Sequence, residues 1–304
     1  MIEDQRLHRF TKQRLSRRSL LRGATFAGIG AVGLVAVGCG DDDKSTLEQA
    51  RESGRIRIGF ANERPYGFAD SGGNVTGEAP TVAKAVLERL GITEVDAIVV
   101  PFGSLIPGLE AGRFDIIAAG MFINPDRCRQ ILFSDPDYCV PQAFAVERGN
   151  PLGILTFDDI AANPDIRVGI PTGAVEEQYA LDAGASQNQI VNFDDIAGAG
   201  EALQAGRIDA VAATTLAIQA ELERLGDPDL EATPGFDVVI DGKPASGCGG
   251  YGFRSDDEEL RDAFNEVLVE MKDNNEIRPL VEEFGFTDEV EAAKGRTAAE
   301  LCEG

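Results

Sequence analysis

The stretch LEAGRFDIIA, residues 109–118, returns 94 residues later as LQAGRIDAVA, residues 203–212, with six of ten positions identical. Each copy has the pattern of a helix end, a glycine at the helix C-terminus and then a short, wholly apolar strand. Unbroken apolar strands are typical of parallel sheets that helices cover on both faces. The repeat therefore predicts two similar α/β lobes, each built around one copy.

The rest of the chain continues this alternation of strands and helices. Further strands are predicted at residues 55–60, 96–100, 166–170, 190–193 and 238–240. Helices are predicted over residues 81–90, from a capping box of Ser255 and Glu258 to about Met271, and over 276–284 with a stop at Gly285.

Two strand-like stretches, residues 138–146 and 249–253, are expected to cross between the lobes. The expected boundaries are residues 46–140 plus 254–304 for lobe I and 141–253 for lobe II. Ligands of open α/β sheets bind beyond the carboxyl ends of the strands. Those ends are residues 119–122 in lobe I and 213–215 in lobe II, which we expect to form two walls of one cleft.

Residues 1–38 have the composition of an export signal. The pair Arg17-Arg18 precedes an apolar run of 15 residues, which is shorter than the roughly 20 that a spanning helix needs. Ala36-Val37-Gly38-Cys39 is similar to a lipobox, although Ala36 stands where such sites usually carry Leu. We therefore expect a twin-arginine lipoprotein signal, lipid on Cys39 and a tether over residues 39–45. The protein would lie at the outer face of the cytoplasmic membrane or in the periplasm.

Charge and histidine content narrow the class of function. Without residues 1–38 the chain has 21 basic and 50 acidic residues, a formal charge of −29. This charge argues against nucleic acid as a partner and favours a soluble monomer. The only histidine, His8, lies in the expected signal, so the mature chain lacks the histidine of nucleophilic triads and of common zinc sites. We expect no catalysis, no cofactor and no metal.

Five motifs give the mature chain a resemblance to a known family. They are FANERPYGF at residues 60–68, GEAP at 77–80, FGSLIPGL at 102–109, GMFINPDRC at 120–128 and GIPTG at 169–173. The chain resembles the family 3 extracellular solute-binding proteins of amino-acid-type ABC importers. Within them it resembles most the receptors for ectoine and hydroxyectoine. The resemblance implies a two-lobed, type II periplasmic-binding-protein-like fold, closure around a small zwitterion and delivery to ABC permease subunits.

The resemblance also implies roles for single side chains. Arg127 matches the arginine that clamps the ligand carboxylate, and Glu63 matches the acid that meets the cationic ring. Tyr66, Phe102 and Phe122 match an aromatic cage. Each has an ordinary structural alternative, such as a core position for a phenylalanine or a surface ion pair for the arginine.

The chemistry of ectoine agrees with these roles. Ectoine is a cyclic amidinium that carries a carboxylate. A planar guanidinium suits the carboxylate, and aromatic faces suit a delocalised cation. In lobe II, Thr172-Gly173-Ala174-Val175 stands between a strand and a helix, where backbone N–H groups are expected to meet a carboxylate.

Thr214 helps to distinguish between the possible classes of ligand. Receptors for α-amino acids commonly carry an Asp at this point to hold the ammonium group, and a buried ammonium without a partner is costly. A polar amino acid or a betaine remains the alternative ligand. A cyclohexadienyl-dehydratase-like enzyme on the same fold is the distant alternative, which lacks a histidine for general acid catalysis.

Four cysteines follow Cys39, and an even number in an exported protein predicts disulfides. Four cysteines allow three pairings. Cys128 with Cys302, both in lobe I, and Cys139 with Cys248, both beside the crossing strands, is the pairing that we expect.

Overall fold

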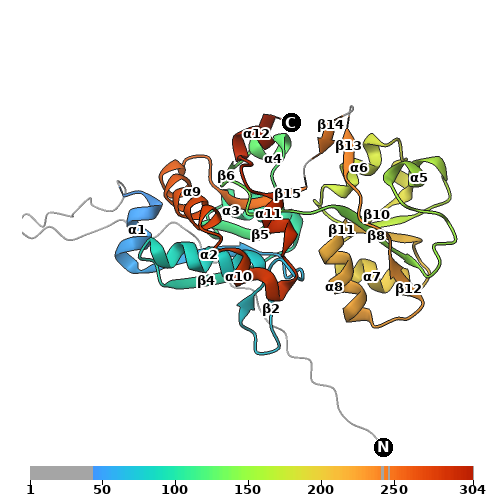
Figure 1. Ribbon diagram of the computed structural model, residues 1–304, viewed down its shortest axis with the longest axis horizontal. Helices are drawn as coiled ribbons and strands as arrows, with labels where there is room; N and C mark the ends of the chain where they lie inside the picture. The colour runs from blue at the N-terminus through green and yellow to red at the C-terminus, as the bar shows by residue number, and fades with distance from the viewer. Residues whose placement is uncertain (1–43, 241–242, 246, 304) are drawn as a thin grey trace, which may run out of the picture. The chain divides into compact units, whose positions relative to one another are not determined.

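Two sheets organise the described part of the chain, which in this computed structural model comprises residues 44–240, 243–245 and 247–303 (Figure 1). The expected signal, Cys39 and all but the last two residues of the expected tether lie outside these residues. Among the described residues, no helix is both long and apolar enough to cross a membrane.

The first sheet, in lobe I, surrounds the strand of the first repeat copy. Its order is β4-β1-β5-β15-β6, and β7 also pairs with β15. β1, β4 and β5 are parallel, whereas β15 is antiparallel to its neighbours. The bounds are β1 Arg55–Phe60, β4 Glu94–Val99, β5 Ile116–Phe122, β6 Leu132–Phe133, β7 Tyr138–Cys139 and β15 Cys248–Phe253.

The second sheet, in lobe II, surrounds the strand of the second copy in the order β10-β9-β11-β8-β12. β9, β10 and β11 are parallel, and β8 is antiparallel to both of its neighbours. In each sheet a single strand, β15 or β8, runs against the others, so most strands point the same way, in agreement with the expected fold class. The bounds are β8 Gln142–Glu147, β9 Val168–Pro171, β10 Ile190–Phe193, β11 Ala210–Thr214 and β12 Leu230–Ala232. Two hairpins are separate from both sheets. One pairs β2 Phe68–Ala69 with β3 Val75–Thr76, and the other pairs β13 Val238–Ile240 with β14 Lys243–Ala245.

Helices cover both sheets (Figure 1). Those of lobe I are α1 Thr46–Ser53, α2 Glu78–Arg89, α3 Leu105–Glu110, α4 Pro125–Cys128, α9 Glu258–Asp273, α10 Arg278–Val281, α11 Asp288–Ala292 and α12 Ala298–Glu303. Those of lobe II are α5 Phe157–Ala162, α6 Glu176–Asp182, α7 Ile196–Gln204 and α8 Thr215–Leu225. Short 3-10 helices are η1 Phe102–Ser104, η2 Gln187–Gln189 and η3 Glu282–Phe284.

The two repeat strands are buried on both faces, as their apolar sequences predict. Along β5, Ile116 and Ala118 face one apolar core while Ile117 and Ala119 face another. Along β11, Val211 and Ala213 likewise face a different core from Ala210 and Ala212. This alternation follows from the period of two in a strand.

The turns before these strands also repeat. Gly112 and Gly206 both have positive φ, at 66° and 64°, which glycine adopts without strain. One residue further, the N–H of Arg113 donates to Gly108 O and that of Arg207 to Ala202 O, both at 2.9 Å. The sequence repeat is therefore a repeat of backbone geometry.

The repeat aspartates both bind the neighbouring strand. Asp115 Oδ2 accepts from the N–H of Arg57 at 3.2 Å, and Asp209 Oδ2 accepts from the N–H of Arg167 at 2.7 Å. Asp115 also receives the guanidinium groups of Arg57 and Arg254. Each carboxylate thus binds the neighbouring strand one residue before the pairing between the two strands begins.

Two segments cross between the lobes, and they differ from the expected strands. Residues 138–146 split at Pro141 into β7 in the first sheet and β8 in the second. β15 lies wholly in the first sheet, so lobe II ends before Cys248 and not at residue 253. The reason is pairing, because β15 hydrogen-bonds β5, β6 and β7 of lobe I.

Both expected cysteine pairs are disulfides in the structure. Cys139 and Cys248 join the two crossing segments, where the N–H of Val140 also donates to Gly247 O at 2.8 Å. Cys128 and Cys302 join α4 to α12. Both bridges therefore hold segments that lie far apart in sequence.

Two helix predictions need correction. α9 begins after Asp257, not through a Ser255–Glu258 capping box. Asp257 takes that place because its carboxylate accepts from Thr46 Oγ1 at 2.5 Å and pairs with Arg254 at 2.6 Å. The helix expected over residues 276–284 is split into α10 and η3, and it ends at Gly285 as predicted.

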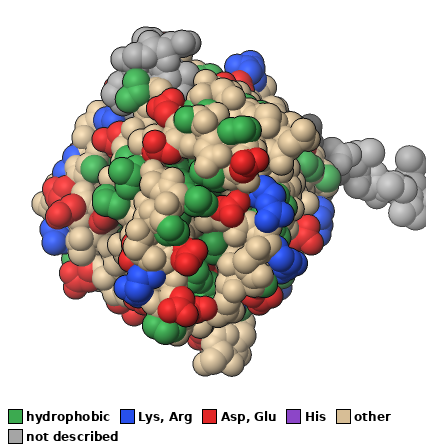
Figure 2. All heavy atoms as spheres, turned by 90° about the vertical axis from the view of Figure 1, so that its right-hand side faces the viewer, with side chains coloured by type: hydrophobic (Ala, Val, Ile, Leu, Met, Phe, Trp, Pro, Cys, Tyr) green, Lys and Arg blue, Asp and Glu red, His purple; other side chains and the backbone are tan. Residues whose placement is uncertain are grey.

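The lobe II face of the molecule carries charges of both signs (Figure 2). Acidic side chains are spread over it, and the basic ones stand singly among them without forming a continuous patch.

Candidate functional site

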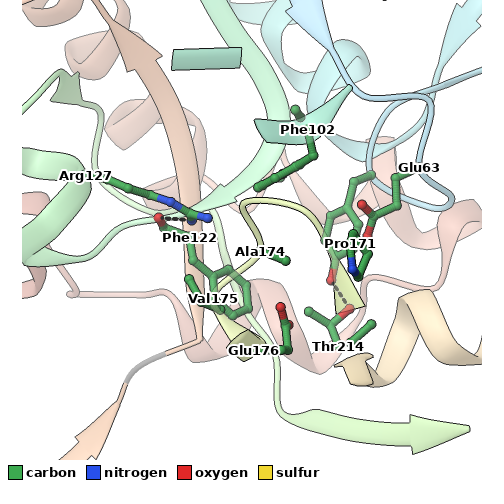
Figure 3. Close-up of a pocket in the computed structure, with 13 residues that line it drawn as sticks. Glu63, Phe102, Phe122, Arg127, Pro171, Ala174, Val175, Glu176 and Thr214 are labelled. Carbon is green, nitrogen blue, oxygen red and sulfur yellow. Dashed lines mark hydrogen bonds between the residues drawn. The ribbon is translucent and has the colours of Figure 1, made fainter. Parts of the chain in front are cut away.

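A pocket lies where the carboxyl ends of β1 and β5 meet β9 and β11 (Figure 3). The space between its walls, together with the open solvent at its mouth, is about 440 Å³. It is lined by Glu63, Tyr66, Phe102, Ala119, Gly120, Phe122, Arg127, Pro171, Ala174, Val175, Glu176, Ala213 and Thr214. The structure thus brings together seven of the nine sequence-predicted site residues; the other two, Thr172 and Gly173, are not among the lining residues.

Arg127 is held in place by its own short helix. Asn124 caps α4 by accepting from the N–H of Arg127 at 2.9 Å. The guanidinium is buried, and it donates to Phe122 O at 2.8 Å and across the lobes to Gly173 O at 3.0 Å. Burial lowers the pKa of Arg127 from its ordinary value, but an arginine remains charged in proteins.

Phe102 lies beside the guanidinium, and Phe122 is a second aromatic residue that lines the pocket. The Phe102 ring centroid lies 5.4 Å from the Arg127 guanidinium carbon, a cation–π distance. Phe122 ends β5, and its centroid is 6.4 Å from that of Tyr138. Phe102 is half-buried whereas Phe122 is buried, so both have the placement expected of pocket walls.

Tyr66 lies deeper than a simple cage residue. Its ring packs against Tyr138 and Phe286, with centroids 5.4 Å away in each case. Its hydroxyl donates to Thr214 Oγ1 at 2.7 Å and so joins the two lobes. Gly120 makes this possible, because a Cβ there would lie 2.3 Å from the Tyr66 ring.

Thr214 has a structural role as well as a place in the pocket. It is the N-cap of α8, and its Oγ1 accepts from the N–H of Ala217 at 3.2 Å. Its hydroxyl oxygen therefore accepts from both Tyr66 and the helix. This position offers the pocket no negative charge.

Two carboxyl groups share the pocket with the single arginine. Burial, together with the charges of Glu176 and Asp195, raises the pKa of Glu63 to about 8. Burial raises the pKa of Glu176 to about 7, although Arg127 and Gln142 act in the opposite direction. The Gln142 amide nitrogen, in the orientation that satisfies it, donates to Glu176 Oε1 at 2.8 Å.

Two of the backbone N–H groups in residues 172–175, where an anion site is expected, are bound within the protein. The N–H of Thr172 donates to Phe193 O at 2.8 Å, and that of Ala174 to Pro171 O at 3.1 Å. Gly173 instead packs against Gly103 of the other lobe. A bond to the end of β10 uses the first donor, and a turn at Pro171 uses the second. Of Thr172, Gly173 and Ala174, only Ala174 lines the pocket.

Glu176 is the residue that the sequence analysis missed. An acid in the first turn of a helix is common because the helix dipole favours it, so its type and position give no signal of a site. No group of three or more His, Cys, Asp or Glu in the described ranges could hold a metal ion.

The fold and this pocket define a two-lobed binding protein that takes a small ligand between its lobes. The family model of the bacterial extracellular solute-binding proteins, family 3, matches residues 56–287, and the chain belongs to this family.

Known relatives agree with this assignment. The chain is 37% identical over 260 residues to y4tE of Sinorhizobium fredii (strain NBRC 101917 / NGR234), named a probable amino-acid ABC transporter periplasmic-binding protein. The match covers 84% of this chain and 86% of the relative. It is 26% identical to the arginine-binding extracellular protein ArtP of Bacillus subtilis (strain 168), over 78% of this chain and 89% of ArtP.

Solved structures are similar as well. EhuB in complex with hydroxyectoine is 38% identical, with a TM-score of 0.78, over 84% of this chain and 97% of that chain. The ancestral amino-acid-binding protein AncCDT-1, a precursor of cyclohexadienyl dehydratase, is 28% identical, with a TM-score of 0.68, over 79% and 99%. The chain is therefore a solute-binding protein of an amino-acid-type ABC transporter and not an enzyme.

Proposed function

We propose that the protein is an extracytoplasmic receptor for ectoine or hydroxyectoine and delivers this zwitterion to the permease of an ABC importer. The observation that carries the proposal is the pocket itself, in which one buried arginine, two aromatic rings and an acid line a single small volume between the lobes. The similarity to hydroxyectoine-bound EhuB supports it.

Each end of such a ligand has a matching group. Arg127 suits the carboxylate because a guanidinium presents a planar set of donors. Glu63 suits the amidinium because its buried carboxyl has no cationic neighbour among the groups that shift its pKa. Phe102 and Phe122 suit the faces of a delocalised cation.

Thr214 supports a ligand without an α-ammonium group. A threonine whose oxygen already accepts from Tyr66 and Ala217 gives an ammonium no ionic partner. A polar amino acid would therefore bury its ammonium at a cost.

A second candidate is a cationic amino acid such as arginine. The pocket has two acids against one arginine, an excess that suits a ligand with a net positive charge. The similarity to ArtP, an arginine-binding protein, points the same way.

Calorimetric titration separates these candidates. Ectoine, hydroxyectoine, arginine, glutamine and a betaine would each be titrated into the purified protein. We expect ectoine or hydroxyectoine to bind far more tightly than the amino acids. Tight binding of arginine with no heat from ectoine would replace the first proposal by the second.

We also propose that lipid on Cys39 holds the protein at the membrane after export. The support is the Arg17-Arg18 pair and the run Ala36-Val37-Gly38-Cys39. Mass spectrometry of protein extracted from native membranes should find a diacylated Cys39 as the first residue. A mature chain that starts elsewhere without lipid would contradict this anchor.

A further inference from the structure

The charges of the pocket do not balance for a zwitterion. Glu63 and Glu176 face one cation, Arg127. A ligand with one positive and one negative group leaves this excess unchanged. Buried charges without partners are unfavourable, so the pocket has to remove one charge when such a ligand binds.

Glu176 is the acid whose charge acts on both of the other charged groups, Glu63 and Arg127. Figure 3 shows its carboxyl directed into the pocket, with Arg127 and Glu63 on opposite sides. Its side chain is buried in the pocket wall, and its Oε1 accepts from the Gln142 amide at 2.8 Å. Glu176 is also the acid whose charge acts most strongly on Arg127.

Arg127 forms no ion pair with either acid in the described part of the chain. Its Nη1 and Nη2 donate to the carbonyl oxygens of Phe122 and Gly173 instead. A ligand carboxylate that approaches this guanidinium therefore comes close to Glu176. Two carboxylates that share a site cannot both stay ionised at low cost, and one of them keeps a proton.

We infer that Glu176 faces the anionic end of the ligand as a neutral carboxylic acid while Glu63 faces the cationic end as a carboxylate. One proton thus stays in the pocket with the zwitterion, and Glu176 donates it in a hydrogen bond to the ligand carboxylate. This inference rests on the proposed function, because it needs a ligand with both charges.

In the free pocket Glu63 holds its proton more firmly than Glu176, and the charges of the ligand reverse this order. The amidinium favours the carboxylate of Glu63, and the ligand carboxylate favours the neutral acid at Glu176. The pKa of Glu176 is about 7, and that of Glu63 is about 8 partly because Glu176 and Asp195 are near. A neutral Glu176 removes one of these negative neighbours and makes it easier for Glu63 to ionise. The other titratable groups that face them, Tyr66 and Tyr179, have pKa values raised by burial and stay neutral.

The consequence is a binding constant with a maximum between the pKa values of the two acids, about 7 and about 8. Below it, protonation of Glu63 removes the partner of the amidinium. Above it, ionisation of Glu176 repels the carboxylate. On each side of the maximum, which we call the acid and the alkaline limb, the binding constant falls by up to about tenfold per pH unit when binding needs a single protonation state. The ligand stays a zwitterion over this range, so the limbs report the protein.

The test is titration of ectoine from pH 6 to pH 9.5 into the wild type, Glu176→Gln, Glu63→Gln and the control Glu177→Gln on the same helix. Gln resembles the neutral acid. Glu176→Gln should lose the alkaline limb and bind at least about tenfold more tightly than the wild type at pH 9. Glu63→Gln should lose the acid limb, and Glu177→Gln should behave as the wild type.

Other outcomes overturn the inference. If wild-type affinity only rises to a plateau with pH and Glu176→Gln binds more weakly throughout, Glu176 is a second carboxylate for the cation. Failure of the wild type to bind ectoine or hydroxyectoine at every pH would instead reject the proposed function.

Discussion

The two copies of the repeat are alike up to the end of the strand and then differ. In lobe I, β5 continues into Phe122 and leads directly to Arg127 on α4. In lobe II, β11 stops at Thr214, which caps α8. The shared part builds a sheet, and recognition chemistry starts where the copies diverge. Lobe I supplies the arginine and all the aromatic rings that line the pocket, whereas lobe II supplies Glu176, Thr214 and apolar wall.

The sharpest way to test this asymmetry is to remove the cation of lobe I. Arg127→Ala should weaken ectoine binding by about 2–5 kcal/mol, the range for truncating one partner of a buried charge pair. Arg129→Ala is the control, because Arg129 is exposed and pairs with Asp126. Calorimetry on both variants measures the effect, and equal affinities would show that Arg127 does not hold the ligand.

The repeat aspartates compare the two lobes in stability. Asp115→Ala should lower the free energy of unfolding by about 2–4 kcal/mol, because Arg57 and Arg254 both bind it. Asp209→Ala should cost only about 1 kcal/mol, since the carboxylate of Asp209 accepts from the backbone N–H of Arg167 and not from a pair of guanidinium groups. Denaturant unfolding of both variants measures the difference. Equal losses would mean that the side-chain pairs of Asp115 contribute nothing.

The aromatic wall of lobe I should contribute through both area and charge. Phe122→Ala should weaken ectoine binding by about 1–3 kcal/mol through lost burial and lost cation–π attraction. Phe122→Leu should restore most of the burial and none of the π face. Titration of the pair separates the two contributions, and a Leu variant with wild-type affinity would exclude the cation–π part.

The hydrogen bond from Tyr66 to Thr214, which joins the two lobes, should have the smallest effect of the four. Tyr66→Phe removes only the donor to Thr214 Oγ1 and should lower the free energy of unfolding by about 0.5–1.5 kcal/mol. Thr214→Val also removes the cap of α8 and should cost about 1 kcal/mol more. If Tyr66→Phe costs nothing without ligand, the free protein does not make this bond in solution.

The two-lobed framework of strands and turns could be predicted from the sequence because the repeat encodes local geometry. The glycine turns, the apolar strands and the strand-end aspartates all act within a few residues or between adjacent strands. Glu63, Tyr66, Phe102, Phe122 and Arg127 were identified through a family resemblance, and the structure places all five at one pocket.

What the sequence did not reveal depends on contacts between distant segments. The Gly-rich residues 249–253 resemble a crossing strand until their partners are known, and those partners lie more than a hundred residues upstream. The N–H of Thr172 looks free until the carbonyl of Phe193 is placed beside it. Glu176 has the appearance of an ordinary helix-start acid until Gln142 and Arg127 surround it.

The position of β15 between β5 and β6 sets an order of events during synthesis. Lobe II is one continuous segment, so its sheet has all its strands as soon as Ala232 has emerged. The sheet of lobe I is still incomplete at that point, because its two parts stay separate until residues 248–253 follow lobe II out of the ribosome. Helix α4, which carries Arg127, gets its last contact later still, since Cys128 of this helix is bridged to Cys302. The ribosome therefore makes the wall with Glu176 first, and the wall with Arg127 is completed only when nearly all of the 304 residues have been translated.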